Sequence, residues 1–382
     1  MFISAVVLVG ALCIFVYVSI KCRFIQTSTI RANKYTPTRT KELVSTNASD
    51  SASINTNDTA STTTNDPVST NVEDTISAAT DDPVSVNYFP SRKCNYKCGF
   101  CFHTETSSYI LPIDEAKRGL SLLKDAGMRK LNIAGGEPFL YPKFLTEILR
   151  YCKEELHLES VSIVSNGSKI RQKWIRDNCQ WLDILAVSCD SFNPETNKRI
   201  GRGDDGLNVI RLRQIAEWCK MYGIKFKLNT VVNIHNWDED MAKHIQKLAP
   251  FRWKVFQCLI VEGENDNKDR VRDARGFLIS DKQWRTFCDR HQHLPCYVPE
   301  DNSSMASSYL LLDEHMRFMD KGKGKMKLSD SLLKVGVQAA MDQVVWDKKS
   351  FIDRGGIYDW SRPHVVQQSS CGAGENRKEL EY

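Results

Sequence analysis

Three cysteines stand close together in the sequence, at a spacing that suits iron–sulfur chemistry. Cys94, Cys98 and Cys101 form the pattern CX3CX2C on one short segment. Thiolates ligate the irons of [4Fe–4S] clusters, and the ferredoxin pattern adds a fourth cysteine that this segment does not contain. Three thiolates would therefore leave one iron open to another ligand. The spacing favours such a cluster over two alternatives, a zinc site with a distant fourth ligand (the next cysteine is Cys152) and a chance arrangement.

A second motif, Ala134-Gly135-Gly136-Glu137-Pro138, combines backbone freedom with one carboxylate. Glycine lets a backbone approach a ligand closely, because it has no Cβ. The carboxylate of Glu137 can accept hydrogen bonds from an ammonium group. Taken alone, the segment could be a simple glycine turn before a proline. Together with the cysteine motif it indicates a cofactor site.

Polar pairs at alternate positions mark three segments that otherwise have the composition of strands. The pairs are Lys130 with Asn132, Lys227 with Asn229, and Arg252 with Lys254. In a strand, residues i and i+2 point to the same face, so each pair shares one side of the sheet. Branched apolar residues normally fill the interior of a barrel. Inward-facing polar rows would therefore need a bound anion, whereas the alternative is that the rows face outward into solvent.

These motifs fall within a regular alternation of strand-like and helix-like segments. We expect strands at residues 84–89, 130–134, 160–164, 184–188, 225–232 and 253–260. We expect helices near residues 113–126, 143–154, 168–178, 207–221 and 239–248. Six βα repeats predict an α/β fold with a parallel sheet and right-handed crossovers, either an open doubly wound sheet or a whole or partial barrel. In either fold the two motifs follow strands at the carboxyl edge, where active sites lie.

The composition is that of an ordinary globular protein with additional terminal segments. With 41% hydrophobic and 26% charged residues in a chain of 382, collagenous, coiled-coil and wholly disordered classes are excluded. Thirteen cysteines are too sparse for a small disulfide scaffold, and their number is odd. The net charge is +5, and without the acidic residues 45–86 the remainder carries +12. So basic a remainder favours an anionic partner such as phosphate, nucleic acid or a membrane surface.

The first residues are apolar enough to cross a membrane. Residues 2–20 contain no charged side chain, and these nineteen residues would span roughly 28 Å as a helix, close to the thickness of a hydrocarbon core. Basic residues follow the apolar run, which by the positive-inside rule predicts a cytosolic body. A cleaved signal peptide is the alternative, but a basic stretch would then precede the apolar run.

A spacer of distinct composition follows the predicted anchor. Residues 45–86 include seven acidic residues, seventeen Ser or Thr, and no Lys or Arg. Such a segment buries too little apolar surface to offset its ordering entropy, so we expect a disordered linker. We therefore divide the chain into a membrane-anchor helix (1–24), a basic flank and linker (25–83), a catalytic body (84–300) and a C-terminal extension (301–382).

The cysteine and glycine motifs resemble those of the radical S-adenosylmethionine superfamily. In that superfamily the open iron of a [4Fe–4S] cluster binds the amino and carboxylate groups of S-adenosylmethionine. Further segments resemble the viperin family within it, among them NYKCGFCFHT, LNIAGGEPF, SIVSNGS, SCDSF, IGRG, RWKVFQCLIVEGEN and SSYLLLDEHMRF. The resemblance implies a partial (βα)6 TIM-like barrel with a C-terminal α-rich extension. It also implies an antiviral enzyme that dehydrates CTP to 3′-deoxy-3′,4′-didehydro-CTP, after a 5′-deoxyadenosyl radical abstracts the 4′ hydrogen.

The resemblance implies roles for individual residues. Cys94, Cys98 and Cys101 would hold the [4Fe–4S] cluster. The contacts to S-adenosylmethionine would be Gly135, Gly136, Glu137, Ser165, Asn166, Ser188 and Arg202. The contacts to the nucleotide would be Asn87, Lys130, Asn132, Lys227, Asn229, Arg252, Lys254 and Tyr309. Tyr309 would also be catalytic, by delivering hydrogen to the substrate radical or by steadying the pocket, and a packing role is the alternative.

The resemblance also implies a location and partners. We expect the cytosolic face of the endoplasmic reticulum membrane, and lipid droplets, with attachment through the N-terminal helix and no direct nucleic-acid partner. Relatives usually begin with an amphipathic helix, so the helix could span the membrane or lie on its surface. Relatives commonly end in Trp, which docks cytosolic iron–sulfur assembly factors, whereas this chain ends at Tyr382 and leaves that partner open. Ala134 stands where relatives often have Ser, which removes one hydroxyl near the expected triphosphate.

Other functions fit part of the pattern. A radical S-adenosylmethionine enzyme could act on UTP, on a peptide or on tRNA, but peptide- and tRNA-modifying members often carry an auxiliary cluster or an RNA-binding domain, and neither is visible in the sequence. A membrane-tethered adaptor with a structural cluster is a further alternative, against which the polar rows argue. CTP and UTP are not separated by sequence, because base recognition depends on the geometry of the pocket.

Overall fold

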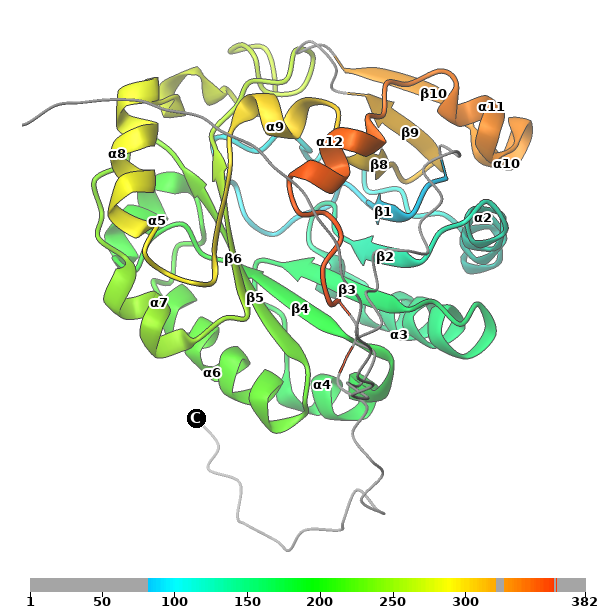
Figure 1. The fold of residues 1–382 in the computed structure, drawn as a ribbon, viewed down its shortest axis with the longest axis horizontal. Coiled ribbons are helices and arrows are strands. Elements are labelled where there is room, and N and C mark those ends of the chain that lie inside the picture. Colours follow the sequence, from blue (N-terminus) through cyan, green and yellow to red (C-terminus); the bar gives the residue numbers. More distant parts are fainter. Residues whose placement is uncertain (1–81, 321–325, 361, 363–382) are drawn as a thin grey trace, which may run out of the picture. The chain divides into compact units, whose positions relative to one another are not determined.

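The computed structural model describes residues 82–320, 326–360 and 362 (Figure 1). The predicted membrane anchor at residues 1–24, and all but the last residues of the predicted linker, lie outside the described residues. Within the described ranges, no helix combines the length and the apolar character needed to cross a membrane.

Ten strands form one sheet in the order β10-β9-β8-β1-β2-β3-β4-β5-β6-β7. The strands are β1 (Ser85–Tyr88), β2 (Lys130–Ile133), β3 (Ser160–Ser165), β4 (Ile184–Ser188), β5 (Lys225–Val232), β6 (Arg252–Gln257), β7 (Tyr297–Glu300), β8 (Leu310–Leu312), β9 (Arg317–Asp320) and β10 (Lys327–Ser331). Neighbouring strands from β8 through β1 to β7 are parallel. β1 to β6 are the six predicted strands in chain order. A doubly wound sheet would reverse this order at a switch point, so the partial barrel is confirmed.

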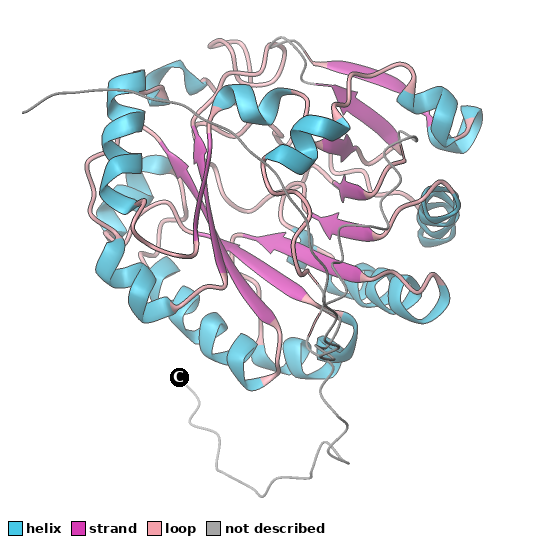
Figure 2. Cartoon of the chain, viewed as in Figure 1, coloured by secondary structure: helices cyan, strands magenta, loops and turns pink. Residues whose placement is uncertain are grey.

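Helices follow the strands and lie along the outer side of the sheet (Figures 1 and 2). They are α2 (Ile113–Asp125), α3 (Pro142–Arg150), α4 (Gln172–Asn178), α5 (Pro194–Ile200), α6 (Asn208–Met221), α7 (Ala242–Leu248) and α8 (Asp281–His291). Short turns of other helical types are η2 (Pro138–Leu140), η3 (Tyr151–Glu155), η4 (Cys179–Trp181) and η5 (Ala274–Phe277). η3 follows α3 directly, so the helix predicted near residues 143–154 is present as an α-helix that continues into a π-helical turn.

The hydrophobic core lies between the strands and these helices. In α2, Ala116, Leu120 and Leu123 recur at three- and four-residue spacing and are fully buried. In β5 the burial alternates strictly, with Phe226 and Leu228 among the buried residues. The intervening positions of β5, which include Lys227, are half-buried and face the other side of the strand. Polar side chains are thereby directed away from the helix layer.

The C-terminal extension completes the sheet instead of forming a separate layer. It contains α9 (Asn302–Ala306), α10 (Leu332–Val335), α11 (Val337–Met341) and α12 (Lys348–Asp353), and also β8, β9 and β10. After β7 at one edge, the chain crosses to the far side and pairs Leu310, Leu311 and Leu312 with β1. The sequence suggested an α-rich extension and did not indicate these strands. Their pairing satisfies the backbone groups that the free edge of β1 would expose.

Candidate active site

A cavity of about 300 Å³ opens at the carboxyl ends of the central strands. It brings together most of the residues that the sequence marked. The predicted residues that line it are Asn87, Cys94, Cys98, Cys101, Asn132, Gly135, Gly136, Ser165, Asn166, Ser188, Arg202, Lys227, Asn229, Lys254 and Tyr309. The three cysteines, the glycine motif and the polar rows therefore face one common space.

Backbone contacts fix the cysteine loop against the glycine motif. The amide of Gly136 donates to the carbonyl of Ser91 (2.9 Å), and the amide of Glu137 donates to the carbonyl of Lys93 (2.9 Å). A Cβ placed on Gly136 would lie 2.0 Å from the Lys93 carbonyl oxygen. Because that distance is far inside van der Waals contact, glycine is required for the two loops to meet.

A second glycine loop holds the cysteine loop from the opposite side. The amide of Lys97 donates to the carbonyl of Gly201 (3.1 Å), and the amide of Gly99 donates to the carbonyl of Ile200 (3.0 Å). Gly201 has φ +91°, and a Cβ there would lie 2.2 Å from the Lys97 carbonyl oxygen. The Cys98 thiol lies 3.7 Å from the Gly201 carbonyl oxygen. Two glycine turns, after β2 and after α5, thus clamp the segment that carries the cysteines.

The donor set fits an iron–sulfur cluster. Burial raises the pKa of the Cys94 thiol to about 11 and that of the Cys98 thiol to about 12, and it also raises the pKa of Cys101. Thiols of this kind release protons when a metal binds them as thiolates. Within the described residues, no three His, Cys, Asp or Glu side chains converge closely enough for a single metal ion. A cluster spaces its thiolates more widely than one ion does, and all three sulfur-bearing residues face the cavity.

Glu137 lies behind the cavity wall, in contrast to the neighbouring glycines. Its carboxylate accepts hydrogen bonds from the Ser165 hydroxyl (2.8 Å) and from the amides of Phe139 (3.0 Å) and Asn166 (2.7 Å). Burial raises the pKa of Glu137, while these donors oppose that shift. The carboxylate therefore ties the glycine motif to the end of β3. A contact from Glu137 to the cofactor amine stays a prediction.

Arg202 reaches the cavity from the second glycine loop. Its guanidinium forms an ion pair with the fully buried Asp190, with Nε 2.5 Å and Nη2 3.3 Å from the two carboxylate oxygens. The same guanidinium lies over the ring of Phe100 (5.6 Å to the centroid). Ser188, at the end of β4, also lines the cavity. Ser188 and Arg202, which the resemblance places at the cofactor carboxylate, therefore line the same cavity as the cysteines.

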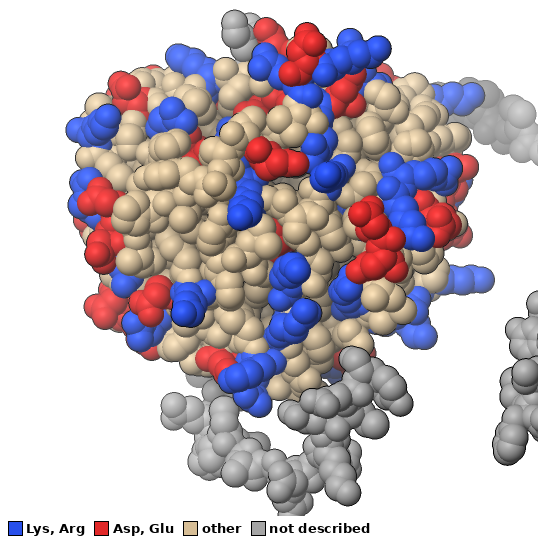
Figure 3. All heavy atoms as spheres, turned by 180° about the vertical axis from the view of Figure 1, so that it is seen from behind, with Lys and Arg blue, Asp and Glu red and all other residues tan. Residues whose placement is uncertain are grey.

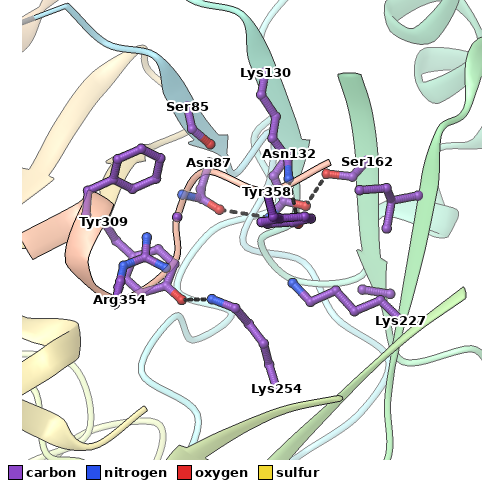
Figure 4. Close-up of a pocket in the computed structure, with 14 residues that line it drawn as sticks. Ser85, Asn87, Lys130, Asn132, Ser162, Lys227, Lys254, Tyr309, Arg354 and Tyr358 are labelled. Atoms are coloured by element: carbon purple, nitrogen blue, oxygen red, sulfur yellow. Dashed lines mark hydrogen bonds between the residues drawn. The ribbon is translucent and has the colours of Figure 1, made fainter. Parts of the chain in front are cut away.

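A smaller cavity of about 50 Å³ lies deeper in the barrel (Figure 4). The residues that line both cavities are Asn87, Asn132, Lys227, Lys254 and Tyr309. The remaining polar or charged residues of the inner cavity are Ser85, Lys130, Ser162, Arg354 and Tyr358. The two spaces are consequently neighbours along the barrel axis, with the cysteines at one end and basic side chains at the other.

Amide side chains cross the strands between the two cavities. The parallel register places Asn87 opposite Asn132, and Asn132 opposite Ser162. Asn132 donates to the Asn87 side-chain oxygen (2.8 Å) and accepts from the Ser162 hydroxyl (2.8 Å). The predicted inward orientation of the β2 and β5 rows is therefore observed, because Lys227 and Asn229 also line the main cavity.

Two lysines in this region have no carboxylate partner in the described part of the chain. Lys130 is buried, and its ammonium lies 2.8 Å from the Tyr358 hydroxyl and over the ring of Trp360. Burial and the neighbouring cations hold the pKa of Lys130 well below its usual value. Burial, with Arg252 and Arg354 nearby, lowers the pKa of Lys227 to about 8.

Glu300 is the carboxylate that the remaining cations share. It forms an ion pair with Lys254, accepts a hydrogen bond from the Tyr309 hydroxyl, and lies 3.3 Å from Nη1 of Arg354. Lys254 also lies 2.6 Å from the Tyr309 hydroxyl oxygen. Burial raises the pKa of Tyr309 well above its usual value, so its hydroxyl stays protonated. Tyr309 precedes β8 in a loop and lines both cavities, and its catalytic role stays a prediction.

Arg252 is the predicted nucleotide contact that lines neither cavity. Its Nη2 donates to the carbonyl of Gly355 (3.0 Å), and its guanidinium lies over the ring of Tyr358 (4.3 Å). The C-terminal segment therefore separates Arg252 from the inner cavity. A direct nucleotide contact from Arg252 stays a prediction.

Sequence reasoning missed four residues of the site. Glu300, Arg354 and Tyr358 come from β7 and from the C-terminal extension, which no motif connected with the body. His103 follows the cysteine motif by two residues. It is buried, lines the main cavity, and has neither ring nitrogen hydrogen-bonded within the described structure. For His103 the adjacent cysteine motif was a usable signal, and for the others the sequence offered none.

The charged side chains on the face seen from behind are scattered (Figure 3). There, Lys and Arg alternate with Asp and Glu, and much of the surface is uncharged (Figure 3). Alternating surface charges of this kind contribute little to binding. The unpaired lysines of the inner cavity are a different case, since a buried charge needs a partner.

Comparisons with known proteins agree with this geometry. The radical SAM superfamily profile matches residues 88–248. The S-adenosylmethionine-dependent nucleotide dehydratase RSAD2 of Danio rerio is 53% identical over 281 residues, which cover 73% of this chain and 78% of that protein. The S-adenosylmethionine-dependent nucleotide dehydratase of Flammeovirga pacifica is 35% identical over 285 residues, covering 72% of this chain and 96% of that protein.

Solved structures show the same fold at low sequence identity. Native anSMEcpe with bound AdoMet has a TM-score of 0.52 at 15% identity, covering 71% of this chain and 82% of that chain. Streptococcus suis SuiB bound to S-adenosylmethionine has a TM-score of 0.51 at 17% identity, covering 72% of this chain and 68% of that chain. These likenesses support the architecture of the barrel.

Proposed function

The chain belongs to the viperin family of radical S-adenosylmethionine nucleotide dehydratases, and from that membership we propose that it dehydrates CTP to 3′-deoxy-3′,4′-didehydro-CTP in antiviral defence. The resident cofactors of the family are a [4Fe–4S] cluster and S-adenosylmethionine. When bound, they would supply a 5′-deoxyadenosyl radical that takes the 4′ hydrogen atom of the substrate. UTP is the alternative nucleotide.

One observation carries the proposal. A cavity lined by three cysteines shares five lining residues with an inner cavity that three lysines line, and two of these lysines, Lys130 and Lys227, have no carboxylate partner among the described residues. Buried cations without partners are costly unless an anion binds them. A nucleoside triphosphate would fit both cavities. Its phosphates would pair with the lysines, and its ribose would lie between the lysines and the cysteines.

The chain's own residues have distinct parts in this scheme. Cys94, Cys98 and Cys101 would hold the cluster, and Arg202 would face the cofactor carboxylate. The substrate, having lost its 4′ hydrogen, must release its 3′ hydroxyl as water, a step that takes up one proton and one electron from the external reductant. The protonated Tyr309 hydroxyl, hydrogen-bonded to Lys254, stands at the junction of the two cavities where that ribose would lie. Tyr309 can therefore hold the proton that the departing hydroxyl needs.

Aromatic side chains line one side of the inner cavity. Tyr358 and Phe351, from the C-terminal extension, line the inner cavity on the side away from the cysteines. Phe351 packs with Val84, Ile184 and Trp360 in a separate apolar cluster. This apolar lining lowers the dielectric around the phosphate region, where each charge-assisted contact would be stronger than in water.

The direct test is a nucleotide panel with the full chain after anaerobic cluster reconstitution. S-adenosylmethionine, a reductant and either CTP, UTP, ATP or GTP are supplied, and 5′-deoxyadenosine and nucleotide products are quantified by mass. We expect a product lighter than CTP by one water, formed in proportion to 5′-deoxyadenosine. Dehydration of UTP in preference to CTP would replace the proposed substrate. Absence of any dehydrated nucleotide would reject the activity.

We also propose the location and partners that the sequence suggested. The predicted anchor at residues 1–24 would attach the enzyme to the cytosolic face of the endoplasmic reticulum membrane and to lipid droplets. Residues 1–24 fused to a fluorescent protein should resist extraction by alkaline carbonate if they span the bilayer. Glycans on Asn47 or Asn57 would overturn the cytosolic orientation. Recruitment of iron–sulfur assembly factors by the C-terminal tail would be tested by truncation before Tyr382.

A further inference from the structure

We propose that the site takes up its nucleoside triphosphate free of Mg²⁺, so that the metal-bound nucleotide is not the substrate form. The inference rests on the proposed function for the identity of the nucleotide, and on the charges of the inner cavity for the rest. Most enzymes that use nucleoside triphosphates bind them with Mg²⁺, which the protein holds through carboxylates. The inner cavity is instead lined by basic side chains, and no described residue of its lining is a carboxylate.

Basic side chains converge on the inner cavity from four elements. Lys130 comes from β2, Lys227 from β5, Lys254 from β6, and Arg354 from the end of α12. Figure 4 shows the three lysines extending from their strands toward the centre of the pocket. Arg252 lies just behind the ring of Tyr358. In this position it adds to the positive potential without lining the cavity.

Carboxylates are scarce by comparison. Glu105 is the one carboxylate among the described residues that line either cavity, and it pairs with Arg272 at the cysteine end. Mg²⁺ in such sites needs one or two protein carboxylates in addition to the phosphate oxygens. No described residue of the inner cavity wall offers one.

Glu300 is close but already engaged. One of its oxygens contacts Lys254 and Arg354, and the other accepts from the Tyr309 hydroxyl. Glu300 is 1% exposed and lies behind these side chains, away from the cavity wall. To ligate a metal it would have to abandon two cations inside a buried region, which is strongly unfavourable.

The net charge of the side chains at the inner cavity also favours the metal-free nucleotide. The four cations at the cavity, together with Arg252, face the single carboxylate of Glu300, an excess of four positive charges when all are protonated. A metal-free nucleoside triphosphate carries about four negative charges at neutral pH, since its terminal phosphate has a second pKa near neutrality. Mg²⁺ would cancel about half of that charge and bring a strongly hydrated dication among unpaired cations. The cavity is therefore complementary to the free nucleotide.

The test has a binding arm and a turnover arm, both with the reconstituted full-length enzyme. CTP binding is measured by calorimetry at constant ionic strength, first with a chelator and then with Mg²⁺ rising until nine-tenths of the CTP is complexed. We expect the apparent Kd, expressed in total CTP, to rise about tenfold, because only free nucleotide binds. Turnover at subsaturating CTP should fall in parallel, and rates plotted against free CTP should lie on one curve.

The two arms separate the inference from the proposed function. CTP binding that Mg²⁺ strengthens or leaves unchanged overturns the inference, whatever the turnover. Binding that Mg²⁺ weakens, with no dehydrated product, keeps the metal-free site and rejects the dehydratase function. Formation of 5′-deoxyadenosine without nucleotide serves as the control for effects of Mg²⁺ on the cofactor.

A variant sharpens the result. Asn132→Asp places a carboxylate on the wall shared by both cavities, beside Asn87. We expect weaker binding of free CTP and a reduced or reversed effect of Mg²⁺, because the new carboxylate can ligate the metal. The matched control is Glu262→Gln, an exposed position, which should keep the wild-type Mg²⁺ dependence. An Asn132→Asp enzyme with wild-type Mg²⁺ dependence would contradict the charge argument.

Discussion

The two ends of the active site are built in different ways. At the cysteine end, backbone hydrogen bonds and glycines hold the loop, so that Gly136 and Gly201 bring three chain segments to within contact of one another. At the basic end, long side chains from four separate elements converge, and two of them, Lys254 and Arg354, pair with one carboxylate, Glu300. The cysteine end is therefore rigid and intolerant of added volume. The basic end is governed by charge and should respond to charge, pH and metal ions.

The largest expected effect comes from adding one methyl group at the cysteine end. Gly136→Ala would place a Cβ 2.0 Å from the Lys93 carbonyl oxygen, so the two loops must separate. We expect the reconstituted variant to lose most of its iron and sulfide, and with it all formation of 5′-deoxyadenosine. Gly276→Ala is the matched control, because nothing lies within 4 Å of its added Cβ. Full iron content in Gly136→Ala would show that the loop contact does not support the cluster.

A charge removed at the basic end should give the next largest effect and spare the cysteine end. Lys254→Ala removes charge-assisted hydrogen bonds worth about 1.5–3 kcal/mol, which corresponds to roughly a tenfold to hundredfold loss of CTP affinity. Formation of 5′-deoxyadenosine without nucleotide should persist, since the contacts of Lys254 are to Glu300 and Tyr309. The measurements are the Kd for CTP and the uncoupled rate. Lys220→Ala, on the exposed side of α6, is the control.

The same contrast explains what could be predicted from the sequence. The cysteine end could be predicted because its residues are contiguous in two motifs. The strands could also be predicted, and β4 and β5 match their predicted bounds. The partners of the basic end could not, because Glu300 and Arg354 are single residues of common types, far from any motif. β8 was not predicted for a similar reason, because its three leucines form a strand only through pairing with β1. Glu137 was expected at the ligand, but its carboxylate is engaged by local donors.

We expect a smaller effect of pH on CTP affinity, confined to the basic end. Lys227 has a pKa lowered to about 8 by burial and by Arg252 and Arg354, with Glu300 opposing. A bound triphosphate would raise that pKa, so its favourable contribution is complete below pH 8 and is lost as the pH rises above it. We expect CTP affinity to fall by up to about tenfold per pH unit above pH 8, with proton uptake on binding.

Lys225, which lies on β5 together with Lys227, provides the control for this titration. Lys225 pairs with Asp359 at the amino-terminal start of β5 and lines neither cavity, so Lys225→Arg should leave the pH profile unchanged. Lys227→Arg keeps its charge at every pH and should flatten the profile. Calorimetry in buffers of different ionisation enthalpy, with a chelator present, measures the proton uptake directly. A profile in Lys227→Arg that still falls above pH 8 would assign the titration to another group, with Lys130 and Lys254 as the candidates.

The smallest effect should come from the residue that closes the basic end. The Tyr358 hydroxyl accepts one hydrogen bond from the Lys130 ammonium (2.8 Å), while its ring packs against the guanidinium of Arg252. Tyr358→Phe keeps the ring and removes the hydroxyl, so the loss is limited to about 0.5–1.5 kcal/mol. That corresponds to a change of severalfold in the Kd for CTP, with the cluster content and the uncoupled rate unchanged. A Tyr358→Phe variant with impaired cluster content would mean that the two ends are not independent, and the division of the site into a backbone-built end and a charge-built end would have to be abandoned.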